Sequence, residues 1–144
     1  MQGRKSFCSS AAFLAVLAVS LVWTGCATAP PSNVKMVQCT GSKIEWQVAP
    51  EAEITKFDCA LGTHGGEPSL IYSVGLKNLA SQPYRFRLGI FLPEMDKAVS
   101  YLVPTKGKPP QLAAGEETTV KIPFMKTTTM PEKVMVRVAP MSSD

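Results

Sequence analysis

Apolar and polar side chains alternate with a period of two along several segments of the chain. This period places alternate side chains on opposite faces of a β-strand, whereas no segment sustains the spacing of an amphipathic helix. In the clearest case, residues 84–92, one face carries Tyr84, Phe86, Leu88, Ile90 and Leu92, and the other carries Arg85, Arg87, Gly89 and Phe91. The same pattern predicts strands at residues 70–78, 118–124 and 133–138, and in weaker form at 34–39, 43–48, 54–59 and 98–103.

Segments rich in glycine, proline and small polar residues separate these strands. Residues 79–83 join two of the strong strands at hairpin length, and residues 62–68, 106–110 and 113–116 have the composition of loops and turns. Pro123 cannot donate a ladder hydrogen bond, so its strand is expected to lie at a sheet edge or to end there. About seven to eight short strands separated by turns predict an all-β fold, an antiparallel β-sandwich.

A strand that ends at Asn78 is followed by a short connection, a second strand, and the turn Leu112-Ala113-Ala114-Gly115-Glu116 before residues 118–124. This succession resembles small immunoglobulin-like or fibronectin-type domains, which often carry an apolar-x-x-Gly-Glu turn before a strand. It is also similar to the arrangement in small periplasmic lipoproteins of bacteria. The resemblance covers residues 70–138 and implies an immunoglobulin-like β-sandwich, but a shared fold does not transfer a function.

The first 26 residues have the order of features found in an export signal. Arg4 and Lys5 precede an apolar run at residues 11–23, which is shorter than the roughly 20 residues of a permanent membrane-spanning helix. Thr24 and Gly25 then lead to Cys26. This resembles the lipobox of bacterial lipoproteins, although a tryptophan replaces the usual leucine three residues before the cysteine. The alternative is an ordinary secretory signal that is cleaved near Ala27 or Ala29.

The lipobox resemblance implies a division of the chain into a signal peptide at 1–25, a lipidated tether at 26–33 and a β-sandwich domain at 34–144. Cys26 would receive a diacylglyceryl group, become the first mature residue and hold the protein to the lipid bilayer. Each buried methylene contributes about 0.8 kcal/mol, so two or more chains make a durable anchor. Ala27, in place of an aspartate, implies the periplasmic face of the outer membrane.

Two cysteines, Cys39 and Cys59, remain after Cys8 departs with the leader and Cys26 is lipidated. An even pair in an oxidising compartment predicts a structural disulfide. One alternative is a metal site formed with His64, but a structural site needs four ligands with close paired spacing, which this sequence lacks. A redox-active pair would lie closer together in sequence.

The charge of the chain excludes a strongly basic nucleic-acid binder. The sequence has 15 Lys and Arg against 11 Asp and Glu, a net charge of +4, and loss of Arg4 and Lys5 with the leader leaves +2. No Ser-His-Asp or Cys-His set can be assembled from the spacing of these residues, and no motif for a cofactor or a catalytic metal is present. We therefore expect a non-enzymatic protein without a cofactor.

The outward positions of the predicted strands are enriched in basic residues. If the strands that carry them pair, Arg85, Arg87, Lys133 and Arg137 form a basic surface patch that suits anionic lipid, lipopolysaccharide or an acidic protein. The alternative is that these side chains only cover an exposed sheet face. The resulting hypothesis is a binding or assembly module for another envelope protein or polymer. A second hypothesis is a structural or chaperone-like accessory subunit that acts by edge-strand addition.

Overall fold

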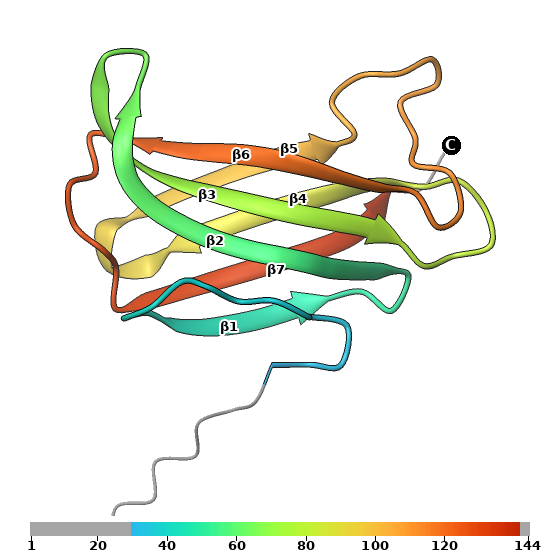
Figure 1. Ribbon diagram of the computed structural model, residues 1–144, viewed down its shortest axis with the longest axis horizontal. Coiled ribbons are helices and arrows are strands. Elements are labelled where there is room, and N and C mark those ends of the chain that lie inside the picture. Colours follow the sequence, from blue (N-terminus) through green and yellow to red (C-terminus); the bar gives the residue numbers. More distant parts are fainter. Residues whose placement is uncertain (1–29, 142–144) are drawn as a thin grey trace, which may run out of the picture.

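Within residues 30–141, seven β-strands form two sheets that pack face to face (Figure 1). This computed structural model describes residues 30–141, so the predicted leader, Cys26 and the start of the tether lie outside the described residues. A short 3-10 helix, Pro93–Met95, joins the fourth and fifth strands. The strands are β1 (Lys43–Val48), β2 (Ala52–His64), β3 (Glu67–Asn78), β4 (Arg85–Leu92), β5 (Lys97–Val103), β6 (Glu117–Met125) and β7 (Lys133–Met141).

The four-stranded sheet has the order β1-β7-β4-β5, and the three-stranded sheet has the order β2-β3-β6. In the nomenclature of immunoglobulin-like sandwiches, β2 to β7 correspond in chain order to strands A, B, C, C′, E and F. The three-stranded sheet then has the order A-B-E, and β7, β4 and β5 have the order F-C-C′. The predicted all-β sandwich is therefore confirmed. The expectation of purely antiparallel pairing is wrong at one place, because β1 lies beside β7 in the position of strand G and runs parallel to it.

The predicted inward faces form the core between the sheets. Phe86, Leu88, Ile90 and Leu92 of β4 have no exposed surface, and neither do the alternate residues of β3 from Leu70 to Leu76. Ring centroids lie 5.1 Å apart for Trp46 and Phe57 and 5.3 Å apart for Phe57 and Tyr72. Burial raises the pKa of the Tyr72 hydroxyl above its usual value, and that hydroxyl has no hydrogen-bond partner.

The connection at residues 79–83 does not form the predicted hairpin. β3 pairs with β2 and β6, whereas β4 pairs with β5 and β7, so the connection crosses from one sheet to the other. Asn78 holds the start of this crossing. Its side-chain amide donates to the carbonyls of Gln82 (2.9 Å), Leu112 (3.0 Å) and Ala113 (3.2 Å).

The segment at residues 62–68 is not a loop, contrary to the prediction from its glycine and proline content. β2 and β3 continue to His64 and Glu67, and a two-residue turn at Gly65 and Gly66 joins them. Both glycines have positive φ, 59° and 83°, as a tight hairpin with the twist of its strands requires. The hairpin tip stands away from the sandwich at the top of Figure 1.

The predicted strand at residues 34–39 is wrong, since this segment makes only two isolated parallel bridges to β2, at Val34 and Val37. Its main chain bonds to Ile54 and Phe57 of β2, and the chain then crosses to β1 in the other sheet. The side-chain amide of Asn33, the last residue of the predicted tether, donates to the carbonyl of Ala52 at 3.0 Å.

Pro123 lies in β6, which is an edge strand as predicted. Within residues 30–141, no helix has the length and apolar character needed to cross a membrane.

Cys39 and Cys59 form a disulfide, with Cα atoms 5.1 Å apart and a separation of 20 residues. The bond joins the N-terminal segment to the middle of β2, and the covalent loop that it closes contains all of β1. Because neither sulfur is then free as a thiolate, the bond does not leave a ligand pair for a metal.

Replacing both cysteines, Cys39→Ser with Cys59→Ser, is expected to lower the free energy of unfolding by about 3 kcal/mol, the chain-entropy value for a loop of this length. Urea denaturation with and without a reductant measures the effect. The reductant should destabilise the native protein and leave the double variant unchanged. Equal stability of the native protein in both conditions would show that the bond does not stabilise the fold.

Candidate functional site

The outer face of the four-stranded sheet brings together residues from three strands. Gly89 of β4 lies between Ser100 of β5 and Arg137 of β7, and Arg87 lies opposite Ala139. Because side chains alternate along each strand, all of them project to the face that points away from the core. Arg87 and Arg137 are therefore diagonal neighbours on two paired strands.

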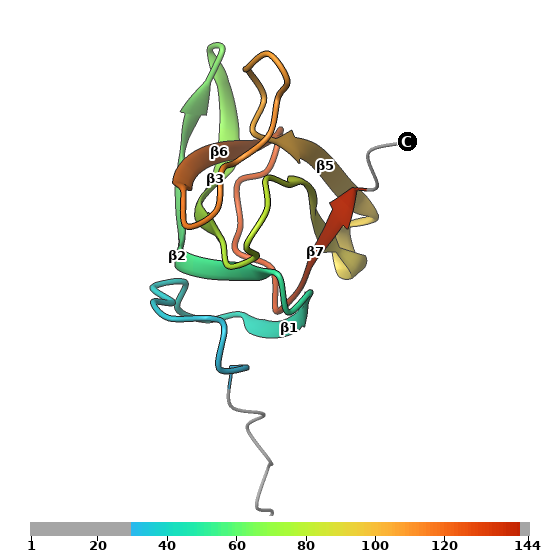
Figure 2. The ribbon, with the colours of Figure 1, turned by 90° about the vertical axis from the view of Figure 1, so that its right-hand side faces the viewer.

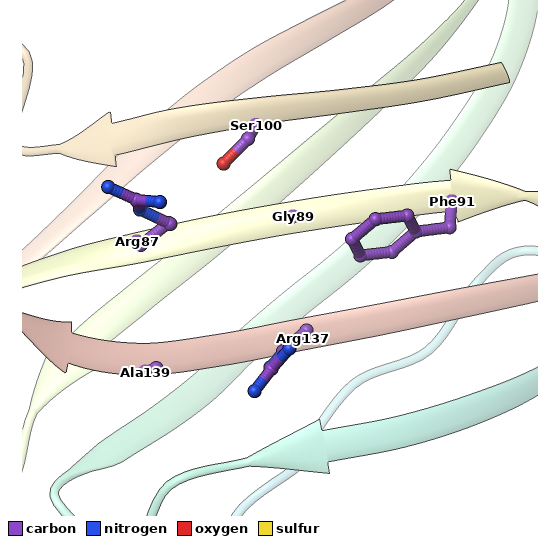
Figure 3. Close-up of a pocket in the computed structure, with 6 residues that line it drawn as sticks. All are labelled: Arg87, Gly89, Phe91, Ser100, Arg137 and Ala139. Atoms are coloured by element: carbon purple, nitrogen blue, oxygen red, sulfur yellow. The ribbon is translucent and has the colours of Figure 1, made fainter.

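These residues enclose a shallow hollow of about 410 Å³, lined by Arg87, Gly89, Phe91, Ser100, Arg137 and Ala139 (Figure 3). Gly89 forms its floor, and the Phe91 ring lies over this glycine. A Cβ atom at position 89 would come within 3.0 Å of Phe91 Cε2, so glycine lets the ring approach the main chain. A second hollow of about 310 Å³ lies on the other side of Phe91, with Ala98 and Met135 in its walls.

The two arginines of the first hollow carry uncompensated charge. Both side chains are exposed, and among residues 30–141 no carboxylate lies within ion-pair distance of either guanidinium. Arg87 makes one weak contact, from Nη2 to Met141 Sδ at 3.9 Å. In Figure 3 the Arg87 side chain extends toward β5 and that of Arg137 toward β1, so positive charge flanks the glycine floor on two sides.

The structure does not bring all four predicted basic residues together. Lys133 lies at the other end of β7 and forms an ion pair with Glu45 of β1, with Nζ and Oε1 2.9 Å apart. Arg85 lies on the same face as Arg87 but is half-buried opposite Met141, and its Nε has no hydrogen-bond partner. Arg87 and Arg137 are therefore the two members of the patch that border the hollow.

Only part of this site could be predicted from the alternation of side chains. Alternation predicts that Gly89 and Phe91 project outward, and an outward phenylalanine beside a glycine is the feature that marks the face. Ser100 lies in a strand that the pattern predicts only weakly, and its proximity to Gly89 depends on the pairing of β4 with β5. His64 does not belong to this face. It is exposed at the tip of the β2–β3 hairpin, which extends from the three-stranded sheet.

The arrangement offers binding groups. Two guanidinium groups can each donate paired hydrogen bonds to a carboxylate or phosphate, Ser100 adds a hydroxyl, and Phe91 adds an apolar surface. Among residues 30–141, no cluster of three or more His, Cys, Asp or Glu side chains is placed to hold a metal ion. Comparison with protein-family profiles, curated proteins and solved structures found no match to this chain.

Proposed function

We propose that this protein is a non-enzymatic, lipid-anchored module of the bacterial cell envelope that binds another envelope component. Its anchor is the acylated Cys26, and its place is the periplasmic face of the outer membrane. The order of charge, apolar run, small residues and cysteine in the leader supports the anchor. The outer face of the four-stranded sheet supports the binding role.

A single observation carries the binding role: Arg87 and Arg137 flank an apolar floor, and neither has a carboxylate partner among the described residues. Arginine and aromatic residues are enriched at the energetic centres of protein interfaces. A partner that presents carboxylate or phosphate groups beside an apolar surface would complement this face. An envelope protein or an anionic envelope polymer has that chemistry.

The position of the face suits a tethered module. In Figures 1 and 2 the chain enters the fold at the bottom, beside β1, and the four-stranded sheet extends from β1 upward to β5. The hollow lies over β4, β5 and β7, away from the entry of the tether. An anchor at Cys26 would therefore leave this part of the sheet open to a partner in the periplasm.

Reversing both charges, Arg87→Glu with Arg137→Glu, is expected to remove the partner from crosslinks formed in intact envelopes. Lys43→Glu with Lys121→Glu is the control, because it makes the same change in net charge at exposed positions outside the hollow and away from β5. Both variants should fold normally, since exposed substitutions usually change stability by less than about 0.5 kcal/mol. Mass spectrometry of the crosslinked products gives the result, and an identical set of crosslinked neighbours in all three proteins would contradict the proposal.

A further inference from the structure

The four sheet edges differ in how well they are protected from pairing with another strand. The first half of β2 is covered by residues 33–38, which bond to its main chain. β6 carries Pro123 and Lys121, and β1 carries Lys43 and Glu45. Proline and charged side chains are the usual means of blocking an edge. Residues 98–103 of β5, Ala-Val-Ser-Tyr-Leu-Val, contain neither.

The register of the sheet shows which main-chain groups of β5 are unpaired. The Ala49 N–H donates to the Val138 carbonyl at 3.0 Å, so the even-numbered residues of β7 direct their main chain toward β1. The odd-numbered residues of β7 therefore bond to odd-numbered residues of β4, and the even-numbered residues of β4 bond to odd-numbered residues of β5. The N–H and C=O groups that point to the open edge consequently belong to Ala98, Ser100 and Leu102.

Basic residues lie near the C-terminal end of β5. The Arg87 side chain extends from β4 toward β5 (Figure 3), and the chain that follows β5 carries Lys106 and Lys108, both exposed. Among residues 30–141, no carboxylate lies within ion-pair distance of any of these three side chains. An acidic segment would therefore be attracted to the edge.

We infer that the open edge of β5 binds an extended, acidic segment of a partner protein as an added antiparallel strand. Main-chain hydrogen bonds to Ala98, Ser100 and Leu102 hold the strand, and its acidic side chains lie on the outer face beside Arg87. This inference rests on the proposed function, for which it names the chemistry of the partner. β5 is the strand of the sheet farthest from the entry of the tether, as both views of the ribbon show (Figures 1 and 2).

The geometry of strand pairing provides a test with synthetic peptides. Paired residues on adjacent antiparallel strands share a face, so the residues of an added strand that face Arg87 also direct their N–H groups to β5. The probe is a capped nine-residue peptide of alternating Glu and Val, with Glu on the outer face. N-methylation of the Glu residues removes the N–H groups that bond to β5, whereas N-methylation of the Val residues removes only N–H groups that point to solvent.

Titration of the membrane-extracted protein with these peptides should show binding of the Glu–Val probe and about tenfold or greater weakening when the Glu residues are N-methylated. N-methylation of the Val residues should change the affinity by less than about threefold, and a Lys–Val peptide should bind at least about tenfold more weakly than the probe. Equal binding of the two N-methylated peptides, or no binding of the Glu–Val probe, overturns the inference. The proposed function would still stand in either case if the crosslinks depend on Arg87 and Arg137.

A substitution in the protein, in place of a change in the peptide, tests the same edge. Ser100→Pro removes an edge N–H without removing a bond to β4, and it should weaken the probe about tenfold. Thr119→Pro is the matched control on the open edge of β6, because Thr119 has the same parity as Pro123, which cannot donate. Unchanged affinity in a folded Ser100→Pro variant overturns the inference, and so does a native dimer that this substitution converts to a monomer. If Ser100→Pro does not fold, the N-methylated peptides decide with the native chain.

Discussion

Replacing Asn78 by alanine is expected to lower the free energy of unfolding by about 3–5 kcal/mol. Asn78 has no exposed surface. Its amide donates to three main-chain carbonyls, at Gln82, Leu112 and Ala113, and its Oδ1 accepts from the Ala80 N–H at 2.9 Å. Alanine would remove all four bonds. The Leu112 and Ala113 carbonyls would keep main-chain donors, but the Gln82 carbonyl and the Ala80 N–H would have no other partner among the described residues, and an unsatisfied buried group costs about 1–3 kcal/mol.

The large expected loss of stability reflects the two segments that Asn78 holds together. Its main chain also accepts from the Gly115 N–H and donates to the Glu116 carbonyl, each at 2.9 Å. One residue thus holds the connection that leaves the three-stranded sheet against the turn that precedes β6. The side-chain bonds of Asn78 add to the main-chain pairing of Tyr84 with Leu112, and together they fix the path of both segments over the end of the sandwich.

Urea denaturation compares Asn78→Ala with two other variants. Asn78→Asp keeps the acceptor for Ala80 but loses the amide donors, so it should be destabilised to a similar degree. Gln47→Ala, at an exposed position of β1, should change stability by less than about 0.5 kcal/mol. A loss below about 1 kcal/mol in Asn78→Ala would contradict the assigned role of this side chain.

Cys26→Ala is expected to abolish membrane attachment and to leave the leader uncleaved before residue 26 or the protein in the soluble fraction. In the proposed account the acyl chains on this sulfur supply the attachment, at about 0.8 kcal/mol for each buried methylene. Fractionation of cells and the size of the product measure both effects. Cys8→Ala is the control, because it removes a leader cysteine that has no place in the lipobox. Persistent membrane fractionation of Cys26→Ala with normal processing would refute the anchor.

Much of the fold could be predicted from the alternation of side chains, because burial of one strand face depends on local sequence. The predicted inward residues of β4 are buried, and the weak strand at residues 43–48 has the bounds of β1. The errors concern which strands are neighbours. Residues 79–83 have hairpin length, but length does not distinguish a turn within one sheet from a crossing between two. The parallel pairing of β1 with β7 joins segments about 90 residues apart and has no local signal.

The candidate site could be predicted only in part for the same reason. Alternation places Arg87 and Arg137 outward, but their proximity comes from the register of β4 with β7. Lys133 has the same outward parity, yet Glu45 compensates its charge from β1, a strand distant in sequence. The open edge of β5 likewise follows from strand order, which the pattern within a single strand does not contain.

The intact mass of the protein, extracted from its native membrane, tests the lipid anchor most directly. We expect a chain that begins at Cys26 and carries a diacylglyceryl group on its sulfur, with or without an acyl group on its amine. A free thiol at residue 26, or a chain that still carries residues 1–25, would contradict the account.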